Sequence, residues 1–284
     1  MEETRAVIPM RPLTFGELLD AAVSLLRAQA PLLLGAALVL AACEQALLFP
    51  LRSWSHMELP FFWLSRSHIG ESWLVFCIGV TTEGTILALL GGLAGAAAGP
   101  GLLGRPARAR GLLGQVLRRG PALLVVAAVT AALLLITSLV AMLPWLLVFG
   151  LLGLAAPALV VDRVGPWRAV GRSFKLAGRG LRGAAIRLGG YVSWVAIRTA
   201  LGLGGAAVLQ IWVRNGETAF TLAMIAIWAL VDAVAYATLA CIDAVLYLET
   251  RMRVEGLDVA IGRLRRLGRP IDLASSVILG TAVR

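Results

Sequence analysis

An uncharged stretch of about forty residues and the basic segment after it decide the fold. Residues 121–161 read PALLVVAAVTAALLLITSLVAMLPWLLVFGLLGLAAPALVV, and residues 162–187 read DRVGPWRAVGRSFKLAGRGLRGAAIR. A bilayer core takes roughly 20 apolar residues per helix, so the first segment is long enough for two crossings joined by a tight turn. Pro144, with Trp145 beside it, is the predicted position of that turn.

Arginines flank this hairpin at both ends. Arg118 and Arg119 precede it, and a run of basic residues that begins at Arg163 follows it. The two ends of a hairpin lie on the same side of a membrane, and arginine-rich loops are retained in the cytoplasm. We therefore expect both flanks of the hairpin to be cytoplasmic.

The composition predicts an all-α integral membrane protein. Of the 284 residues, 59% are hydrophobic and 15% are charged, and the mean hydropathy is +0.86. Soluble domains are about 25% charged. The net charge of +10 does not indicate nucleic-acid binding, because the arginines cluster at the ends of apolar segments, where membrane topology places them. The bias towards arginine, with abundant alanine, glycine and leucine, indicates a GC-rich bacterial genome. The predicted location is therefore the bacterial cytoplasmic membrane.

The other apolar segments predict four further crossings. With the hairpin they give six spans: 31–51, 73–99, two within 121–161, 188–212 and 219–248. Both termini are then cytoplasmic, and all but four of the 26 basic residues lie on that side. The domains are a mobile cytoplasmic tail, a six-helix membrane domain and a second cytoplasmic tail: 1–13, 14–256 and 257–284. Residues 271–284 give no prediction of fold, and the first residues contain no basic region typical of a signal peptide.

A short amphipathic segment precedes each pair of spans. Thr14 and Glu17 match a capping box at the start of the first, which is about 13 residues long. The second includes residues 112–117, and the third runs from Pro166 to Leu181. We expect these three helices to lie on the cytoplasmic membrane surface. Each of these surface helices is followed by a pair of spans, and this unit occurs three times, which predicts three pseudo-repeats.

The third amphipathic helix has a basic stripe at helical spacing. Such a stripe suits the anionic lipids of an inner leaflet, with a tryptophan at the level of the headgroups. The predicted headgroup contacts are Trp167, Arg168, Arg172, Lys175 and Arg179.

Small residues mark a helix-packing face in the second span. Gly91, Gly95 and Gly99 form two overlapping G-x-x-x-G patterns, a spacing at which another membrane helix can approach closely. We favour packing within the chain, and the alternative is a contact between two copies of it.

Four ionisable residues lie in the middle of predicted spans. Glu44, Glu83, Arg198 and Asp232 occupy a layer only about 8 Å thick at 1.5 Å per residue, so they could meet. A charge at mid-membrane costs roughly 2.5–3.5 kcal/mol, so these residues should pair. The cluster either fixes helix register or forms a proton or ion pathway. We expect Arg198 to pair with Asp232, Glu44 or both.

The sequence contains no motif for an enzyme. A phosphate-binding loop, a nucleophile elbow and a zinc-protease motif are all absent. His56 and His68 have no further histidine or cysteine nearby, and the three cysteines lie in apolar segments that favour packing. We expect no catalytic site, no metal and no cofactor.

Three segments carry a family resemblance. Residues 11–20 (RPLTFGELLD), residues 156–173 and above all residues 247–258 (YLETRMRVEGLD) resemble bacterial multi-pass proteins of the glycerophosphoryl diester phosphodiesterase membrane-domain family. No part of the chain resembles the catalytic domain to which that membrane domain is joined elsewhere. The resemblance implies assembly with other membrane proteins and with a MoxR-type ATPase system.

Two functions therefore follow from the sequence. The first is a non-catalytic subunit or scaffold of a bacterial envelope complex, and the second is a transporter or channel that uses the acid–arginine cluster. A polar cavity at the cluster favours transport, whereas a dry cluster with an exposed face of small residues favours the scaffold. Anionic lipids, other membrane proteins or a second copy of the chain are the expected partners.

Overall fold

The computed structural model describes residues 7–57, 68–105, 107–179, 181–213 and 218–274, and within these ranges the regular structure is all helical. Six helical segments are long and apolar enough to cross a membrane, so the chain is a multi-pass membrane protein. They are α2 (Ala30–Trp54), α3 (Ile69–Leu103), α5 (Gly120–Val140), α6 and α7 together (Met142–Leu152 and Ala155–Val161), α9 (Arg182–Leu209) and α10 (Thr218–Glu255).

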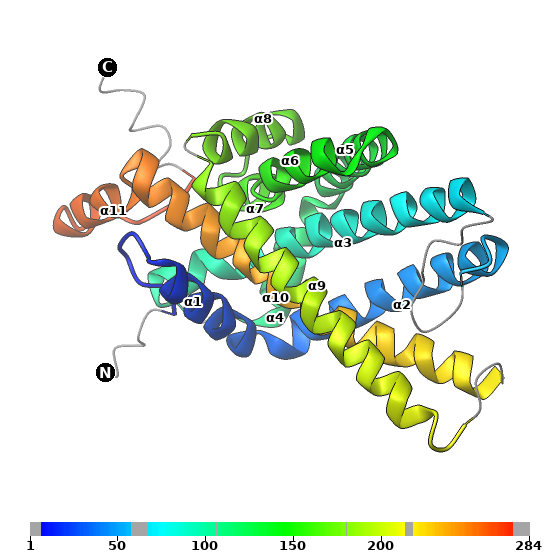
Figure 1. The fold of residues 1–284 in the computed structure, drawn as a ribbon. Coiled ribbons are helices and arrows are strands. Elements are labelled where there is room, and N and C mark those ends of the chain that lie inside the picture. Colours follow the sequence, from blue (N-terminus) through cyan, green and yellow to red (C-terminus); the bar gives the residue numbers. More distant parts are fainter. Residues whose placement is uncertain (1–6, 58–67, 106, 180, 214–217, 275–284) are drawn as a thin grey trace.

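Four shorter helices complete the described part of the chain: α1 (Phe15–Ala28), α4 (Ala109–Arg118), α8 (Pro166–Ala177) and α11 (Leu257–Arg266). They lie by the ends of the long helices where α2 and α9 begin and α3 and α10 finish, which we call the arginine-rich end (Figure 1). A short helix precedes two long helical segments three times along the chain. Whether these three units are related repeats stays a prediction.

A capping box begins α1, at the position that its sequence predicts. The Thr14 hydroxyl accepts from the Glu17 backbone N–H, and the Glu17 carboxylate accepts from the Thr14 backbone N–H. Arg11 also pairs with Glu17. The backbone bond from Thr14 and the bond from Arg11 lower the pKa of Glu17 to about 2.

The turn of the central hairpin lies at Ala141 and not at Pro144. Ala141 is extended (φ −173°, ψ 159°) and separates α5 from α6. Pro144 lies in the first turn of α6, where the N–H that proline lacks has no helical partner in any case. The proline therefore begins a helix here and does not make the bend.

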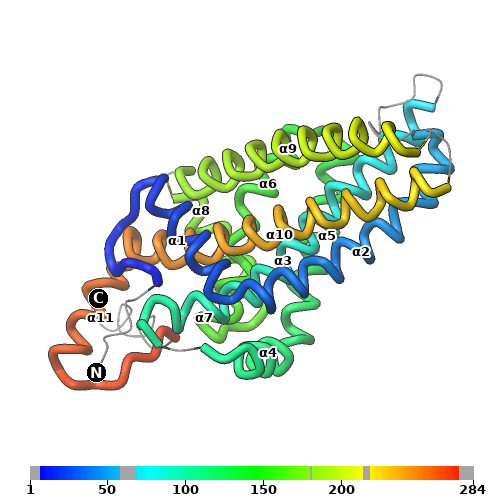
Figure 2. Tube along the Cα trace, turned by 90° about the horizontal axis from the view of Figure 1, so that it is seen from below, coloured from blue at the N-terminus to red at the C-terminus, as the bar shows by residue number. Residues whose placement is uncertain are grey.

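Helix α10 is the central element of the bundle. It packs against α2, α3 and α9 along its length, and against α1 near its arginine-rich end (Figure 2). Its buried stretch is almost continuous from Ala235 to Met252. A helix that is buried on all sides fixes the relative positions of its neighbours, so any polar residue on α10 needs partners from them.

The glycines of α3 pack against α7 within the same chain. A Cβ atom at Gly95 would lie 2.9 Å from the Pro157 Cα atom, and one at Gly91 would lie 3.5 Å from the Ala156 side chain. A Cβ atom at Gly99 would lie 3.3 Å from the side chain of Leu273, which follows α11. The close approach of two backbones that small residues permit is therefore used inside this molecule.

Residues 7–13 do not form the expected mobile tail. Ile8 and Leu13 are fully buried, and the backbone N–H groups of Val7 and Ile8 donate to the Gly101 carbonyl. Gly101 lies in the last turn of α3, where helix carbonyls lack an internal partner. The Leu13 carbonyl accepts from Arg182 at 3.1 Å and from Arg253 at 2.8 Å. This segment is thus attached to three different long helices.

Candidate functional site

Four long helices each contribute one ionisable residue to a cluster in the middle of the bundle. Glu44 comes from α2, Glu83 from α3, Arg198 from α9 and Asp232 from α10, and each is at most 8% exposed. We call these four residues the intramembrane cluster. Their heights along the helices were readable from the sequence, and the packing of α2, α3 and α9 around α10 brings them together laterally.

Arg198 lies between two carboxylates. Its Nη2 atom is 2.7 Å from Glu83 Oε1, and its Nη1 atom is 3.3 Å from Asp232 Oδ1. The expected contact with Asp232 is present, but Glu83, which we had not considered as a partner, is the nearer one. Glu44 was the other expected partner, and in the described structure its carboxylate accepts hydrogen bonds from two hydroxyls instead of pairing with Arg198.

Hydroxyl groups satisfy the remaining carboxylate oxygens. Tyr236 donates to Glu44 at 2.6 Å and Thr82 donates to the same carboxylate at 2.7 Å. Tyr191 donates to Glu83 at 2.9 Å. Buried carboxylates need such donors, because an unsatisfied charged oxygen in a low-dielectric interior is costly.

Gln45 and Arg52 extend the cluster along α2. Gln45 donates to Asp232 at 3.0 Å, and Arg52 donates to the Gln45 side-chain oxygen at 2.7 Å. The predicted first span ends at residue 51, which places Arg52 in the outer loop, but in the structure Arg52 belongs to the last turn of α2 and its side chain turns back to Gln45. Residues seven apart lie on one helix face, so the spacing of Gln45 and Arg52 could have revealed this contact.

A cavity of about 140 Å³ lies against this cluster. Water occupies about 30 Å³ per molecule in the liquid, so the cavity has room for several waters among groups that can bond to them. Three carboxylates face two arginines across it, which leaves one formal negative charge in excess. The lining residues are Glu44, Gln45, Leu48, Arg52, Gly79, Glu83, Arg198, Trp228, Asp232 and Tyr236.

Helix α10 carries further buried ionisable groups between this cavity and the arginine-rich end. Asp243 accepts from Arg187 of α9 at 2.8 Å. One turn further on, Tyr247 donates to Asp162, whose other carboxylate oxygen pairs with Arg251 at 2.8 Å. With Asp232 and Tyr236, these residues form what we call the α10 ladder: Asp232, Tyr236, Asp243, Tyr247 and Arg251.

The Arg187 guanidinium has an unusual position beside the ladder. Its carbon lies 3.8 Å from the centre of the Phe149 ring, and its Nη1 atom is buried without a hydrogen-bond partner in the described structure. A buried cationic N–H without an acceptor is expensive, so this atom is a natural place for an ordered water.

The basic stripe on α8 divides into exposed and buried residues. Trp167 is 70% exposed, and Arg168, Lys175 and Arg179 are exposed too. Arg172 is instead turned inward, with Nε 2.5 Å from Asp162 and Nη2 2.7 Å from Glu255. The predicted headgroup contact at Arg172 is therefore replaced by ion pairs, because the buried carboxylate of Asp162 needs positive partners.

Comparisons of the chain with protein-family models, with curated proteins and with solved structures give no match in any of the three. The family resemblance stays a prediction. Among the described residues, no group of three histidine, cysteine or acidic side chains is placed to hold a metal ion.

Proposed function

We propose that this protein conducts protons across the membrane through the intramembrane cluster and the α10 ladder. The observation that carries the proposal is the polar cavity lined by Glu44, Glu83 and Asp232. Ionisable residues inside membrane spans are costly, and chains of acidic groups there serve as proton relays in pumps and transporters. A proton, unlike a metal ion, needs only one carboxylate and its hydrogen-bonded neighbours.

Proton transfer requires donors and acceptors in contact, and the ladder residues together with their hydrogen-bonded neighbours supply them in two groups. The first group joins Arg52, Gln45 and Asp232, and the second joins Tyr247 and Asp162. The two groups are separated along α10: Asp232 and Asp243 are eleven residues apart, a distance of about 16 Å at 1.5 Å per residue. Waters must bridge that interval, and the unpartnered Nη1 atom of Arg187 lies at its far end.

The proposal includes an orientation of the protein in the membrane. The arginine-rich end faces the cytoplasm of a bacterial cell, and α1, α4 and α8 lie as amphipathic helices on the inner leaflet. Trp167, Arg168, Lys175 and Arg179 then meet anionic headgroups. The lining of the cavity at the cluster extends towards the outer side, since it includes Arg52, which belongs to the end of α2 remote from the arginine-rich end.

The test is proton flux in vesicles. The purified protein is reconstituted into liposomes that contain a pH-sensitive dye, and a potassium diffusion potential drives protons inward. We expect a flux above that of protein-free liposomes, and a return to the protein-free level in Glu44→Gln and Asp232→Asn. Glu71→Gln is the matched control, because Glu71 is a surface carboxylate at the start of α3. A wild-type flux equal to that of protein-free liposomes overturns the proposal.

A different observation favours a second function, that of a non-catalytic membrane subunit. Helix α9 has the least buried apolar window of the six candidate spans. Its uncovered side carries small residues three or four positions apart, a pattern that lets another membrane helix approach. They are Ala185, Gly189, Ser193, Ala196, Ala200, Gly204 and Ala207. The partner would be another membrane protein, as in the MoxR-type systems that the resemblance implies, or a second copy. Cross-linking from a cysteine at Ala196 in native membranes tests it, with Leu143→Cys on α6 as the exposed control.

A further inference from the structure

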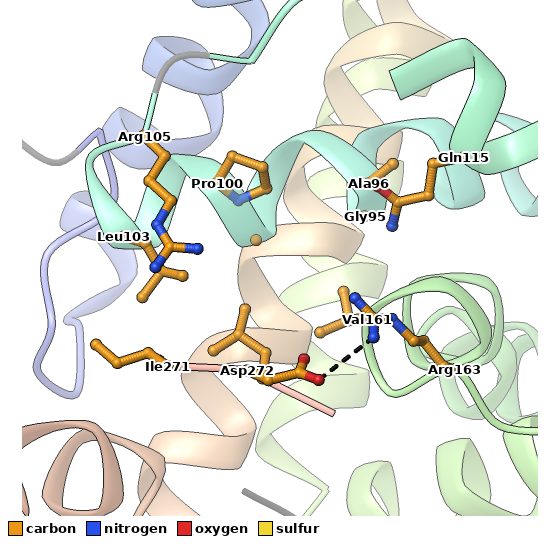
Figure 3. Close-up of a pocket in the computed structure, with 12 residues that line it drawn as sticks. Gly95, Ala96, Pro100, Leu103, Arg105, Gln115, Val161, Arg163, Ile271 and Asp272 are labelled. Atoms are coloured by element: carbon orange, nitrogen blue, oxygen red, sulfur yellow. Dashed lines mark hydrogen bonds and ion pairs between the residues drawn. The ribbon is translucent and has the colours of Figure 1, made fainter. Parts of the chain in front are cut away.

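A second and larger cavity lies at the arginine-rich end. It has a volume of about 310 Å³ and lies between the end of α3, α4, the end of α7 and residues 271–273 (Figure 3). Ligand pockets begin at about this size. It is far along the bundle from the intramembrane cluster, shares no lining residue with that cavity, and is separate from the exposed basic stripe of α8.

The lining of this cavity combines an apolar floor with cationic walls. The floor is formed by α3 residues with small or cyclic side chains, among them Gly99 and Pro100. Arg105, Arg163 and the amide of Gln115 lie around it, from the loop after α3, the loop after α7 and α4 (Figure 3). Guanidinium and amide N–H groups that surround a small space are the donors that phosphate oxygens accept.

Arg163 is held at the cavity by its backbone. Its φ is +55°, in the left-handed region that a non-glycine residue adopts only at an energetic cost. Arg119 donates to the Val164 carbonyl at 3.0 Å and fixes the loop from the other side. The preceding residue, Asp162, is buried among its own ion pairs. The loop conformation is thus maintained by its surroundings while the Arg163 side chain stays 59% exposed.

A carboxylate already occupies part of the anion position. Asp272 Oδ2 lies 3.3 Å from Arg163 Nη1, a long contact between two half-exposed side chains (Figure 3). Among the described residues of the lining, Asp272 is the only acidic one. Its other oxygen, Oδ1, accepts from the Ala274 backbone N–H at 3.1 Å, and the next residue, Leu273, packs at Gly99 and accepts from Arg251 through its carbonyl. A phosphate at Arg163 therefore has to displace the Oδ2 contact, while Leu273 still anchors the segment.

We propose that this cavity binds a phosphate group, with Arg105 and Arg163 as its ligands and with Asp272 displaced from Arg163. The two arginines and the one aspartate give the described lining a formal charge of +1. Displacement of Asp272 raises that formal charge to +2. A phosphate has enough acceptor oxygens for both guanidinium groups, and it would take the place of Asp272 Oδ2 at Arg163 Nη1. The phosphate belongs either to the headgroup of an anionic lipid or to a soluble anion, since the chemistry of recognition is shared.

Calorimetry on the full-length protein, in a maltoside detergent and a phosphate-free buffer, tests the proposal. One arm titrates inorganic phosphate, and the other titrates dihexanoyl phosphatidylglycerol against the zwitterionic dihexanoyl phosphatidylcholine. We expect saturable binding in at least one arm. The double variant Arg105→Gln/Arg163→Gln should weaken it at least about tenfold, the loss expected for two charged hydrogen bonds. Asp272→Asn should strengthen it several-fold, because a competing carboxylate is removed.

The matched control is Arg265→Gln/Arg266→Gln, which removes the same charge from the exposed end of α11. Its affinity should equal that of the wild type, and the melting temperatures of all variants show whether they are folded. Saturation by phosphate identifies a soluble anion, and saturation by phosphatidylglycerol alone identifies a lipid headgroup. The proposal is overturned if neither probe binds, or if the control pair weakens binding as much as the Arg105/Arg163 pair.

Discussion

Arg198 and Glu83 form a 2.7 Å ion pair that joins α9 to α3 across the middle of the bundle. Asp232 on the neighbouring helix α10 is the more distant partner of the same guanidinium, at 3.3 Å. Arg198 therefore does not simply close the α9–α10 hairpin, but connects that hairpin to the first pair of spans. The stability of the cluster should depend on this connection.

Arg198→Ala should destabilise the protein strongly, because it leaves two buried carboxylates without their cation. Breaking a buried pair in this way costs about 3–5 kcal/mol. A second substitution, Glu83→Gln, should restore more of the lost stability than Asp232→Asn does, because Glu83 makes the shorter contact. Thermal melts in detergent measure the set. Glu44→Gln is the control and should restore little, and a larger rescue from it than from Glu83→Gln would contradict the pairing.

Gly95→Ala should destabilise the contact between α3 and α7. The new Cβ atom would lie 2.9 Å from the Pro157 backbone, so one helix has to move. Overpacking of this kind costs about 1–3 kcal/mol. Gly111→Ala on α4 is the control, since nothing lies within 4 Å of the added methyl group, and it should be neutral or stabilising. Equal melting temperatures for the two variants would show that the α3–α7 contact is looser than described.

Arg172→Gln and Arg168→Gln should differ although both remove one charge from α8. Arg172 pairs with Asp162 and Glu255, so its loss should lower the free energy of unfolding by about 1–3 kcal/mol in any lipid. The melting temperature should fall accordingly. Arg168 is exposed, so its loss should leave the melting temperature in neutral lipid unchanged. In anionic lipid, its loss should reduce the stabilisation that the lipid provides by about 1 kcal/mol. Melts in phosphatidylcholine and phosphatidylglycerol nanodiscs separate the two effects. Identical behaviour of the two variants would be inconsistent with the inward position of Arg172.

Single cysteines at Glu71 and Arg110 should report the orientation. In a background without Cys43, Cys77 and Cys241, an impermeant thiol reagent added to intact cells should label position 71 and not position 110. The reason is the excess of arginine at the end of the bundle that contains α4. The reverse labelling pattern would place the arginine-rich end outside.

The capping box of α1 should lose its contribution to stability only in strong acid. The folded pKa of Glu17 is lowered to about 2 from 4.5, so the stabilisation is present above pH 4.5 and is lost as the pH falls towards 2. A carbon-detected NMR titration of labelled Glu17 measures the pKa directly. Arg11→Gln should move the pKa back towards its ordinary value, because it removes one of the two bonds that lower it, and an unchanged pKa in that variant would exclude Arg11 as a cause.

The six spans and the heights of their charged residues could be predicted from the sequence, because apolar length and helical rise are local properties. The sequence did not indicate Glu83 as the nearer partner of Arg198, since height does not specify which helix faces which. Gln45 and Arg52 were missed for a different reason. A loop assignment for Arg52 hid the two-turn spacing that brings it back to Gln45.

The errors at Pro144 and in the N-terminal segment have local causes as well. A proline favours the start of a helix as readily as a turn, and only the extended backbone of Ala141 distinguishes the two. Ile8 and Leu13 are apolar residues in a segment judged to be a tail by its position. Ile8 bonds to Gly101 of α3, about ninety residues later in the chain, and Leu13 bonds to Arg182 and Arg253, later still; no local pattern contains these contacts.

The attachment of the Leu13 carbonyl has a consequence for how the molecule is made. A ribosome delivers residues 7–13 first, but Arg182 and Arg253, which bind that carbonyl, emerge only with the last hairpin. Until both arginines have been synthesised, the Leu13 carbonyl lacks these two donors, although the Gly101 carbonyl that binds Val7 and Ile8 is already present. The N-terminal segment therefore acquires its full set of contacts only when α10 is complete, so the first described residues of the chain are among the last to be fixed in place.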